Sequence, residues 1–183
     1  MMPKIMFISD IHGMAATLKK ALDHADKMQI DRLVILGDIL YHGPRNGVPD
    51  LYDPQKVAKI LNERKEYIIA VRGNCDAEVD QMMLEFPVMA DFSELICGER
   101  RFFLTHGHLW NENSLPSVPA NTVIAHGHTH IAVNKILDNG MTIFNPGSIS
   151  LPKNTIVRTF GIFDGEKLSV LELESGKEFP ALR

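Results

Sequence analysis

The feature that most constrains the fold is an alternation of short apolar runs with amphipathic stretches in the first half of the chain. Residues 4–9, 32–36 and 67–71 are apolar runs typical of buried strands. Between them, residues 14–27 and 54–64 place apolar side chains at helical spacing, and Pro54 suits a first helical turn. Strands that alternate with helices predict βαβ units and a parallel sheet.

The second half of the chain predicts further strands and few helices. Strand-like runs cover residues 88–96, 101–105, 121–125, 132–137, 142–144, 155–163 and 167–173, and hairpin turns are expected at Asp138-Asn139-Gly140 and Asp164-Gly165. A chain of 183 residues without a linker or repeat suits a single domain over residues 1–183. We expect an α/β protein in which a largely parallel sheet packs on a second, mixed sheet.

Five apolar runs end in a residue that can bind a metal ion. Asp10 and His12 follow the first run, and the other four end in Asp38, Asn74, His106, and His128 with His130. Ligands of open α/β sheets bind outside the carboxyl ends of the strands, so parallel strands bring at least the first three ends to one rim. Residues two apart in extended backbone point the same way, which predicts that each Asp/His or His/His pair serves one site.

The seven side chains suit two divalent ions. If Asp38 bridges the ions, each ion receives four protein ligands. A set of imidazoles, carboxylates and an amide oxygen without thiolate suits manganese, iron or zinc more than calcium. Two ions would lower the pKa of a bound water and offset the charge of a phosphoryl group.

Each fragment alone has a simpler interpretation. A DxH sequence after a strand is commonly a capped turn, Asn74 suits a left-handed turn, and His106 suits a hydrogen-bonded core position. A purely structural explanation of all five fragments, however, requires five coincidences in one spatial layer.

Other polar residues near these runs have less specific interpretations. We expect His24 to be solvated and His126 to be a satisfied buried histidine, while His108 lines either the cleft or a loop. The segment 41–46 should overhang the site, with Arg45 as a candidate phosphate partner or merely a solvated residue. Trp110 is expected to pack on the domain.

The bulk properties restrict the partners and the compartment. The formal net charge of -4 and the absence of a basic stripe disfavour long nucleic acids. Two cysteines without CxxC pairing fit a reducing compartment, and neither a secretory signal nor a membrane-spanning run is evident. We expect a cytoplasmic protein that acts on a small substrate, and a homo-oligomer is an open possibility.

The ordered motifs Asp10-x-His12, Gly37-Asp38, Gly73-Asn74, His106 and Gly127-His128-x-His130 resemble the calcineurin-like metallophosphoesterase superfamily. Within it, Gly73-Asn74-Cys75-Asp76 and Asn145-Pro146-Gly147-Ser148 are similar to the small bacterial YfcE-type phosphodiesterases. The resemblance implies a four-layer αββα sandwich of two mixed sheets and attack by a hydroxide that bridges two metals. One metal would take Asp10, His12, Asp38 and His130, and the other Asp38, Asn74, His106 and His128. Mn²⁺ is the expected ion, with Zn²⁺, Ni²⁺ or Fe²⁺ as alternatives.

Cys75 departs from the pattern of many superfamily members, which carry a histidine after the ligand asparagine. A neutral thiol is a poor substitute for an imidazolium, which puts protonation of the leaving group in doubt. Asn74 is a candidate catalytic residue, and Cys75 and Asp76 are weaker candidates. Asp76 is also a candidate for orienting a ligand. The expected activity is phosphodiester hydrolysis. A phosphomonoesterase, which would want more cations than Arg45 and Arg72, and a scaffold like the retromer subunit of this fold are the alternatives.

Overall fold

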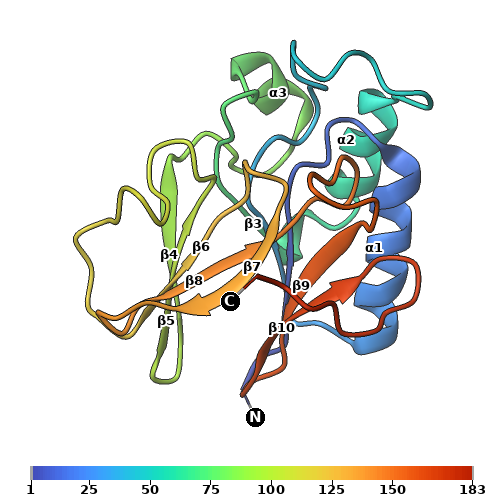
Figure 1. Ribbon diagram of the computed structural model, residues 1–183. Helices are drawn as coiled ribbons and strands as arrows, with labels where there is room; N and C mark the ends of the chain where they lie inside the picture. Colours follow the sequence, from blue (N-terminus) through green and yellow to red (C-terminus); the bar gives the residue numbers. More distant parts are fainter. Residues whose placement is uncertain (1, 183) are drawn as a thin grey trace.

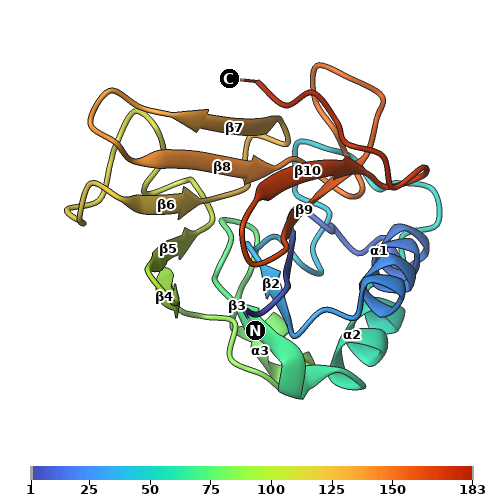
Figure 2. The same ribbon diagram turned by 90° about the horizontal axis from the view of Figure 1, so that it is seen from below.

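The computed structural model describes residues 2–182, which form two β-sheets packed face to face with helices on the outer side of the first sheet (Figures 1 and 2). The first sheet has the order β10-β9-β1-β2-β3, and the second has the order β4-β5-β6-β8-β7. The outer face of the second sheet is covered by the irregular segment 107–120, from which Trp110 and Val118 pack on Phe103 and Ile124. The predicted class, two mixed sheets in an α/β sandwich, is confirmed.

The first sheet contains the predicted parallel βαβ units. β1 (Ile5–Ile8), β2 (Arg32–Ile35) and β3 (Ile68–Ala70) run parallel, while β9 (Thr159–Phe163) and β10 (Leu168–Glu172) extend the sheet in antiparallel fashion. The crossovers contain α1 (Ala15–Met28), α2 (Pro54–Asn62) and the 3₁₀ turn η1 (Lys65–Tyr67). Asp53 caps α2 by accepting a hydrogen bond from the backbone N–H of Lys56 at 3.0 Å.

The second sheet mixes parallel and antiparallel pairs. β5 (Arg100–Thr105), β6 (Thr122–Ala125) and β8 (Thr142–Pro146) are parallel, and β4 (Phe92–Cys97) and β7 (Ala132–Ile136) form antiparallel edges. Both predicted hairpin turns are present, between β7 and β8 and between β9 and β10. The parallel strands of each sheet therefore deliver their carboxyl ends to loops at one end of the molecule.

Two apolar layers hold the sandwich together. One lies between the first sheet and helices α1 and α2, and contains Ile8, Leu18, Ile35 and Leu61. The other lies between the sheets, where Phe7 packs against Phe102 and Phe144 with ring centroids 5.6 and 5.4 Å apart. Because alternate residues of β1 point to opposite faces, Ile8 and Phe7 enter different layers.

Several expectations about individual elements were wrong. A short helix, α3 (Glu78–Met83), follows β3 although no helix was predicted there. β4 and β9 begin later than the runs 88–96 and 155–163 suggested, because the first residues of each run are irregular and pair with no strand. His24 is half-buried rather than solvated: it donates from Nε2 to the carbonyl of Leu173 at 2.9 Å and packs on Phe160.

Among the described residues, no helix is both long enough and apolar enough to span a membrane.

Candidate metal centre

The structure gathers all seven predicted side chains at the carboxyl ends of five strands. Asp10 and His12 follow β1, Asp38 follows β2 and Asn74 follows β3, while His106 follows β5 and His128 and His130 follow β6. The two sheets lie face to face, so these loops meet above the interface between the sheets. Asp10 and His106 are fully buried, and His12 and Asp38 are at most 3% exposed.

The backbone at these positions differs from the expected extended geometry. Five of the seven residues have positive φ angles, from 48° at His12 to 67° at His128. The side chains of Asp10/His12 and of His128/His130 were predicted to point the same way because of extended backbone, and that explanation is wrong. The sharp left-handed turns aim the side chains instead, and such non-glycine conformations cost of order 1–3 kcal/mol each and cluster at functional sites.

Glycines allow the loops to approach one another closely. A Cβ on Gly73 would lie 2.1 Å from Oδ1 of Asp38, and a Cβ on Gly37 would lie 2.5 Å from the backbone nitrogen of Gly73. A Cβ on Gly127 would lie 1.8 Å from Oγ of Ser9 and 2.7 Å from Oδ2 of Asp10. Gly37, Gly73 and Gly127 are thus required for contact between loops from separate strands.

Three histidines are held in one tautomer by backbone carbonyls. Nδ1 of His12 donates to Tyr41 at 2.8 Å, Nδ1 of His106 to Leu36 at 2.6 Å, and Nδ1 of His130 to Leu151 at 2.5 Å. A carbonyl oxygen only accepts, so Nδ1 carries the hydrogen and Nε2 of the neutral ring presents a lone pair to the centre. This is the usual orientation of a metal-binding imidazole.

The lone pairs that converge around Asp10 fit a cation. Nε2 of His12 lies 3.4 Å from Nε2 of His130. Oδ1 of Asp10 lies 3.3 Å from Nε2 of His130 and 3.8 Å from Nε2 of His12, and it is buried without a hydrogen-bond partner among the described residues. Ligand atoms about 2.1 Å from one ion lie about 3 Å apart at right angles and about 3.4 Å apart at the tetrahedral angle, so the two shorter separations match a shared ion.

A second group of ligand-capable atoms lies on the other side of Asp38. Its Oδ1 is 3.5 Å from Nε2 of His106, whereas its Oδ2 is 3.7 Å from Nε2 of His12. Oδ1 of Asn74 lies 3.1 Å from Nε2 of His106, and the His128 ring is centred 5.1 Å from the His106 ring. The two oxygens of Asp38 therefore face different groups, as a bridging carboxylate requires.

The electrostatics of the centre favour added positive charge. Burial would lower the pKa of His106, but the carboxylates of Asp38 and Asp10 reverse that effect and raise the pKa to about 9. Burial also raises the pKa of Cys75, and the charge of Asp38 adds to this shift, bringing the pKa to about 12. Cys75 is therefore a neutral thiol near neutral pH.

Asp76 joins two of the ligand loops. Its carboxylate accepts hydrogen bonds from the backbone N–H groups of Asp38 at 2.8 Å, Ile39 at 2.8 Å and Gly73 at 2.7 Å. Burial raises the pKa of Asp76 to about 6 despite these bonds. Its oxygens point at backbone rather than into the cleft, a geometry that suits the orienting role and not a direct catalytic one.

The end of β8 and the residues that follow it support the loops of Asp10 and His128. Oγ of Ser148 donates to the carbonyl of Asp10 at 2.8 Å, and Nδ2 of Asn145 donates to the carbonyl of Gly127 at 2.8 Å. Hydrogen-bonded supports of this kind fix the ligands they hold. Spacing alone gave no signal for these contacts, although the resemblance included Asn145 and Ser148.

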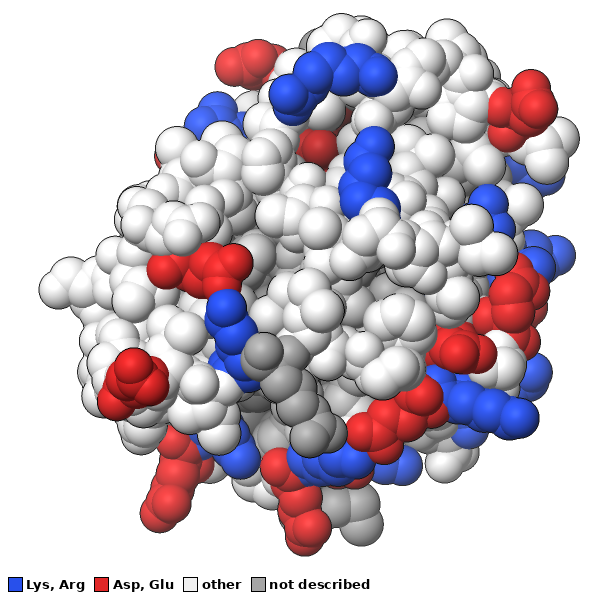
Figure 3. Space-filling model, viewed as in Figure 1, with Lys and Arg blue, Asp and Glu red and all other residues white. Residues whose placement is uncertain are grey.

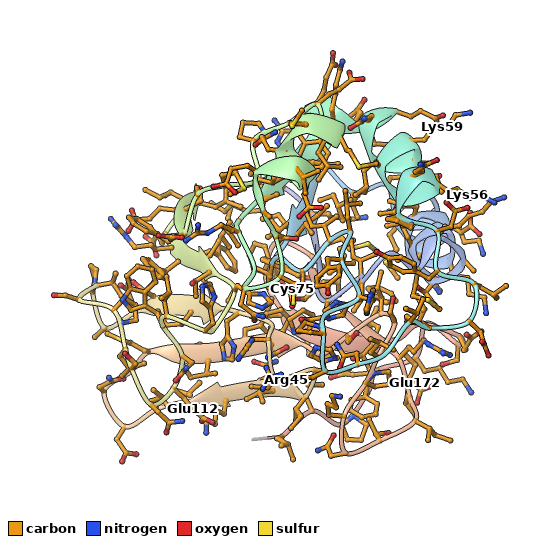
Figure 4. The ribbon with its side chains drawn as sticks, turned by 90° about the horizontal axis from the view of Figure 1, so that it is seen from above. Arg45, Lys56, Lys59, Cys75, Glu112 and Glu172 are labelled. Atoms are coloured by element: carbon orange, nitrogen blue, oxygen red, sulfur yellow. The ribbon has the colours of Figure 1, made fainter. Side chains whose placement is uncertain are left out.

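A cleft of about 610 Å³ opens above the centre, and the predicted overhanging segment lines it through Tyr41, Arg45 and Asn46. Figure 4 looks down on this end and shows Arg45 and Cys75 there, on different loops. Lys153, which sequence reasoning missed, also lines the cleft. Arg72 was a candidate cation, but it forms an ion pair with Asp91 at 2.5 Å and does not line the cleft.

Three further predictions concerned aromatic side chains outside the ligand set. Trp110 packs edge-on against Phe103, as predicted. His126 is buried, and its Nδ1 lies 3.1 Å from the carbonyl of Gly127, but its Nε2 has no partner within the described chain. His108 packs beside His106 at 5.5 Å and does not line the cleft.

The matched family model is the calcineurin-like phosphoesterase superfamily domain, which aligns with residues 3–167. The chain belongs to this superfamily. Phosphodiesterase YfcE of Escherichia coli (strain K12) is 46% identical to the chain over 173 residues, covering 94% of the chain and 93% of the relative. The probable metallophosphoesterase YsnB of Bacillus subtilis is 27% identical over 86% of the chain and 82% of its own length.

Solved structures agree with the family. The structure of YfcE, described as a phosphoesterase from E. coli, superimposes with a TM-score of 0.94 at 43% identity and covers 98% of both chains. Vacuolar protein sorting 29 from Cryptosporidium parvum has a TM-score of 0.63 at 18% identity, with coverage of 97% of this chain and 95% of that chain. This second likeness shows the shared fold alone.

Proposed function

We propose that this member of the superfamily is a metal-dependent phosphodiesterase with a dinuclear centre. The observation that carries the proposal is the convergence of unshielded lone pairs: Nε2 of His12, Nε2 of His130 and the orphaned Oδ1 of Asp10 face one another in a buried space. Such an arrangement is unfavourable unless a cation lies among the atoms.

The ligands divide into two sets that share Asp38. Asp10, His12 and His130 surround one position with Oδ2 of Asp38, and Asn74, His106 and His128 accompany Oδ1 of Asp38 at the other. Two divalent ions held there would supply a hydroxide nucleophile near neutral pH and offset the charge that develops on the phosphoryl group. We propose manganese as the native ion, because the set combines imidazole with oxygen ligands.

The chain's own residues position the reacting groups. Asn74 and His128 line the cleft beside the centre, where they are placed to orient a phosphoryl oxygen. Cys75 also lines the cleft, but its raised pKa keeps it a neutral thiol, which has no positive charge and is a weak proton donor for a leaving group. The site therefore suits diesters with good leaving groups better than monoesters.

The name of the relative supports the diester assignment. A protein called a phosphodiesterase is 46% identical to this chain over nearly the whole of both sequences. A small phosphodiester fits a cleft of about 610 Å³.

The test is an activity screen of metal-stripped protein refilled with manganese, zinc, nickel or magnesium. Bis-p-nitrophenyl phosphate and p-nitrophenyl phosphate serve as diester and monoester reporters with one leaving group. We expect manganese to restore diester cleavage that exceeds monoester cleavage. The reverse ranking would replace the diester proposal with a phosphomonoesterase, and inactivity with every metal would favour the scaffold alternative.

Two histidine variants provide a matched comparison. His106→Gln removes a ligand-capable nitrogen from the centre, whereas His24→Gln changes a half-buried histidine that binds the carbonyl of Leu173. We expect His106→Gln to abolish activity and His24→Gln to retain it. Equal activity of the two variants would contradict the ligand scheme.

A further inference from the structure

The cleft changes in charge between its floor and its rim. Asp38, His12 and His130 form a buried floor, while Arg45 and Lys153 are exposed and line the rim from separate loops. Among the described residues that line the cleft, Asp38 is the one carboxylate. On the face shown in Figure 3, basic side chains stand beside a recess near the top of the molecule.

Neither rim cation is neutralised within residues 2–182. The ion pairs that lysines and arginines form with acidic residues involve other basic residues, such as Arg64 with Asp26 and Lys167 with Glu178, and none includes Arg45 or Lys153. Arg72, the other arginine near this end, is paired with Asp91. The rim therefore presents two free positive charges to an incoming molecule.

Both rim loops are tied to the floor by hydrogen bonds. The backbone N–H of Lys153 donates to the carbonyl of His130 at 3.1 Å, and Nδ1 of His12 donates to the carbonyl of Tyr41 at 2.8 Å. Nδ2 of Asn46 donates to the carbonyl of His42 at 2.9 Å and closes the turn that carries Arg45. Because the loops are fastened to ligand residues, the backbone that carries Arg45 and Lys153 is held beside the floor.

A charge balance shows what the rim is suited to bind. Two divalent ions held there would bring four positive charges against three negative ones, those of Asp10, Asp38 and the hydroxide nucleophile, so the floor would balance the single negative charge of a phosphodiester. The reacting phosphate does not need Arg45 or Lys153. These cations match a further negative charge elsewhere on the substrate.

We infer that the substrates are phosphodiesters in which one esterifying group carries its own anionic group, such as a carboxylate or a second phosphate. Arg45 and Lys153 bind this distal anion while the diester occupies the floor. The inference rests on the proposed function, because it specifies the substrate class of the same site.

The experiment compares three p-nitrophenyl phosphodiesters with one leaving group and different second alcohols. The second group is 2-carboxyethyl, the near-isosteric neutral 2-carbamoylethyl, or the cationic 2-(trimethylammonio)ethyl. The manganese-loaded protein should rank them in that order by kcat/KM. Arg45→Gln and Lys153→Gln should each reduce the ratio of kcat/KM for the carboxylate over the carbamoyl reporter about three- to tenfold. Lys59→Gln, on the exposed side of α2 (Figure 4), should leave the ratio unchanged.

The outcomes separate this inference from the proposed function. Equal kcat/KM for all three reporters would overturn the distal-anion inference and leave the phosphodiesterase standing. Cleavage of none of them would overturn the proposed function, and the inference with it. A larger loss on p-nitrophenyl phosphate than on the carboxylate diester in the Arg45 and Lys153 variants would also overturn the inference, because the cations would then serve a dianionic monoester. Circular dichroism of each variant confirms folding.

Discussion

Asp76→Asn tests how the ligand loops are held. In the wild-type protein Oδ2 accepts from Asp38 and Gly73, and Oδ1 accepts from Ile39. An asparagine keeps one acceptor oxygen, so its NH₂ group must face the N–H of Ile39 or those of the other two residues. A buried donor left without an acceptor costs about 1–3 kcal/mol, and we expect the metal-free protein to lose about this much unfolding free energy.

The larger expected effect is on metal binding. Loss of a group that orients ligands typically lowers metal affinity about 10- to 100-fold. Asp80→Asn is the matched control, because Asp80 is also buried but accepts from the N–H of Ala77 at the start of α3 and not from Asp38, Ile39 or Gly73. Urea denaturation and calorimetric manganese titration measure both quantities. An Asp76→Asn protein that binds manganese within threefold of wild type would refute the proposed role.

Three further predictions follow from single side chains. The Cys75 thiol of the metal-free protein should resist iodoacetamide at pH 8, because its pKa is raised to about 12; rapid alkylation there would contradict the burial argument. The Asp164 carboxylate accepts a hydrogen bond from the N–H of Lys167, which lowers the pKa of Asp164. The stability that this bond contributes is therefore fully present above the ordinary pKa of 3.8 and is lost as the pH falls through the lowered pKa. An NMR titration of Asp164 should show the lowered pKa. Phe102→Ala should lower the unfolding free energy by about 3–5 kcal/mol in chemical denaturation, because Phe102 is fully buried, and Phe92→Ala should lower it much less, because Phe92 is half-exposed. Equal losses for the two variants would contradict the assignment of Phe102 to the core.

Much of the fold was predictable because burial on both faces makes the central strands continuously apolar. β1, β2 and β3 and the helices between them match the predicted segments within a few residues. α3 was missed because six residues are too few to show helical periodicity, and its start is fixed by the Asp80 side chain. The environment of His24 depends on contact with Leu173, which no local pattern reveals.

The site was predictable in its membership but not in its geometry. The apolar runs ending in Asp10, Asp38 and Asn74 follow from the rule for parallel strands. The left-handed turns at His12 and His128 did not follow, because non-glycine residues rarely adopt that conformation unless tertiary contacts stabilise it. Lys153 was missed because its loop reaches the cleft only when the second sheet folds onto the first.

The central claim is that Asp38 joins two cations, one on each of its oxygens. Anomalous diffraction from a crystal of the manganese-loaded protein tests this claim directly. The claim predicts two anomalous peaks about 3.5–4 Å apart, with the Asp38 carboxylate between them. A single peak, or two peaks of which Asp38 contacts neither, would contradict it.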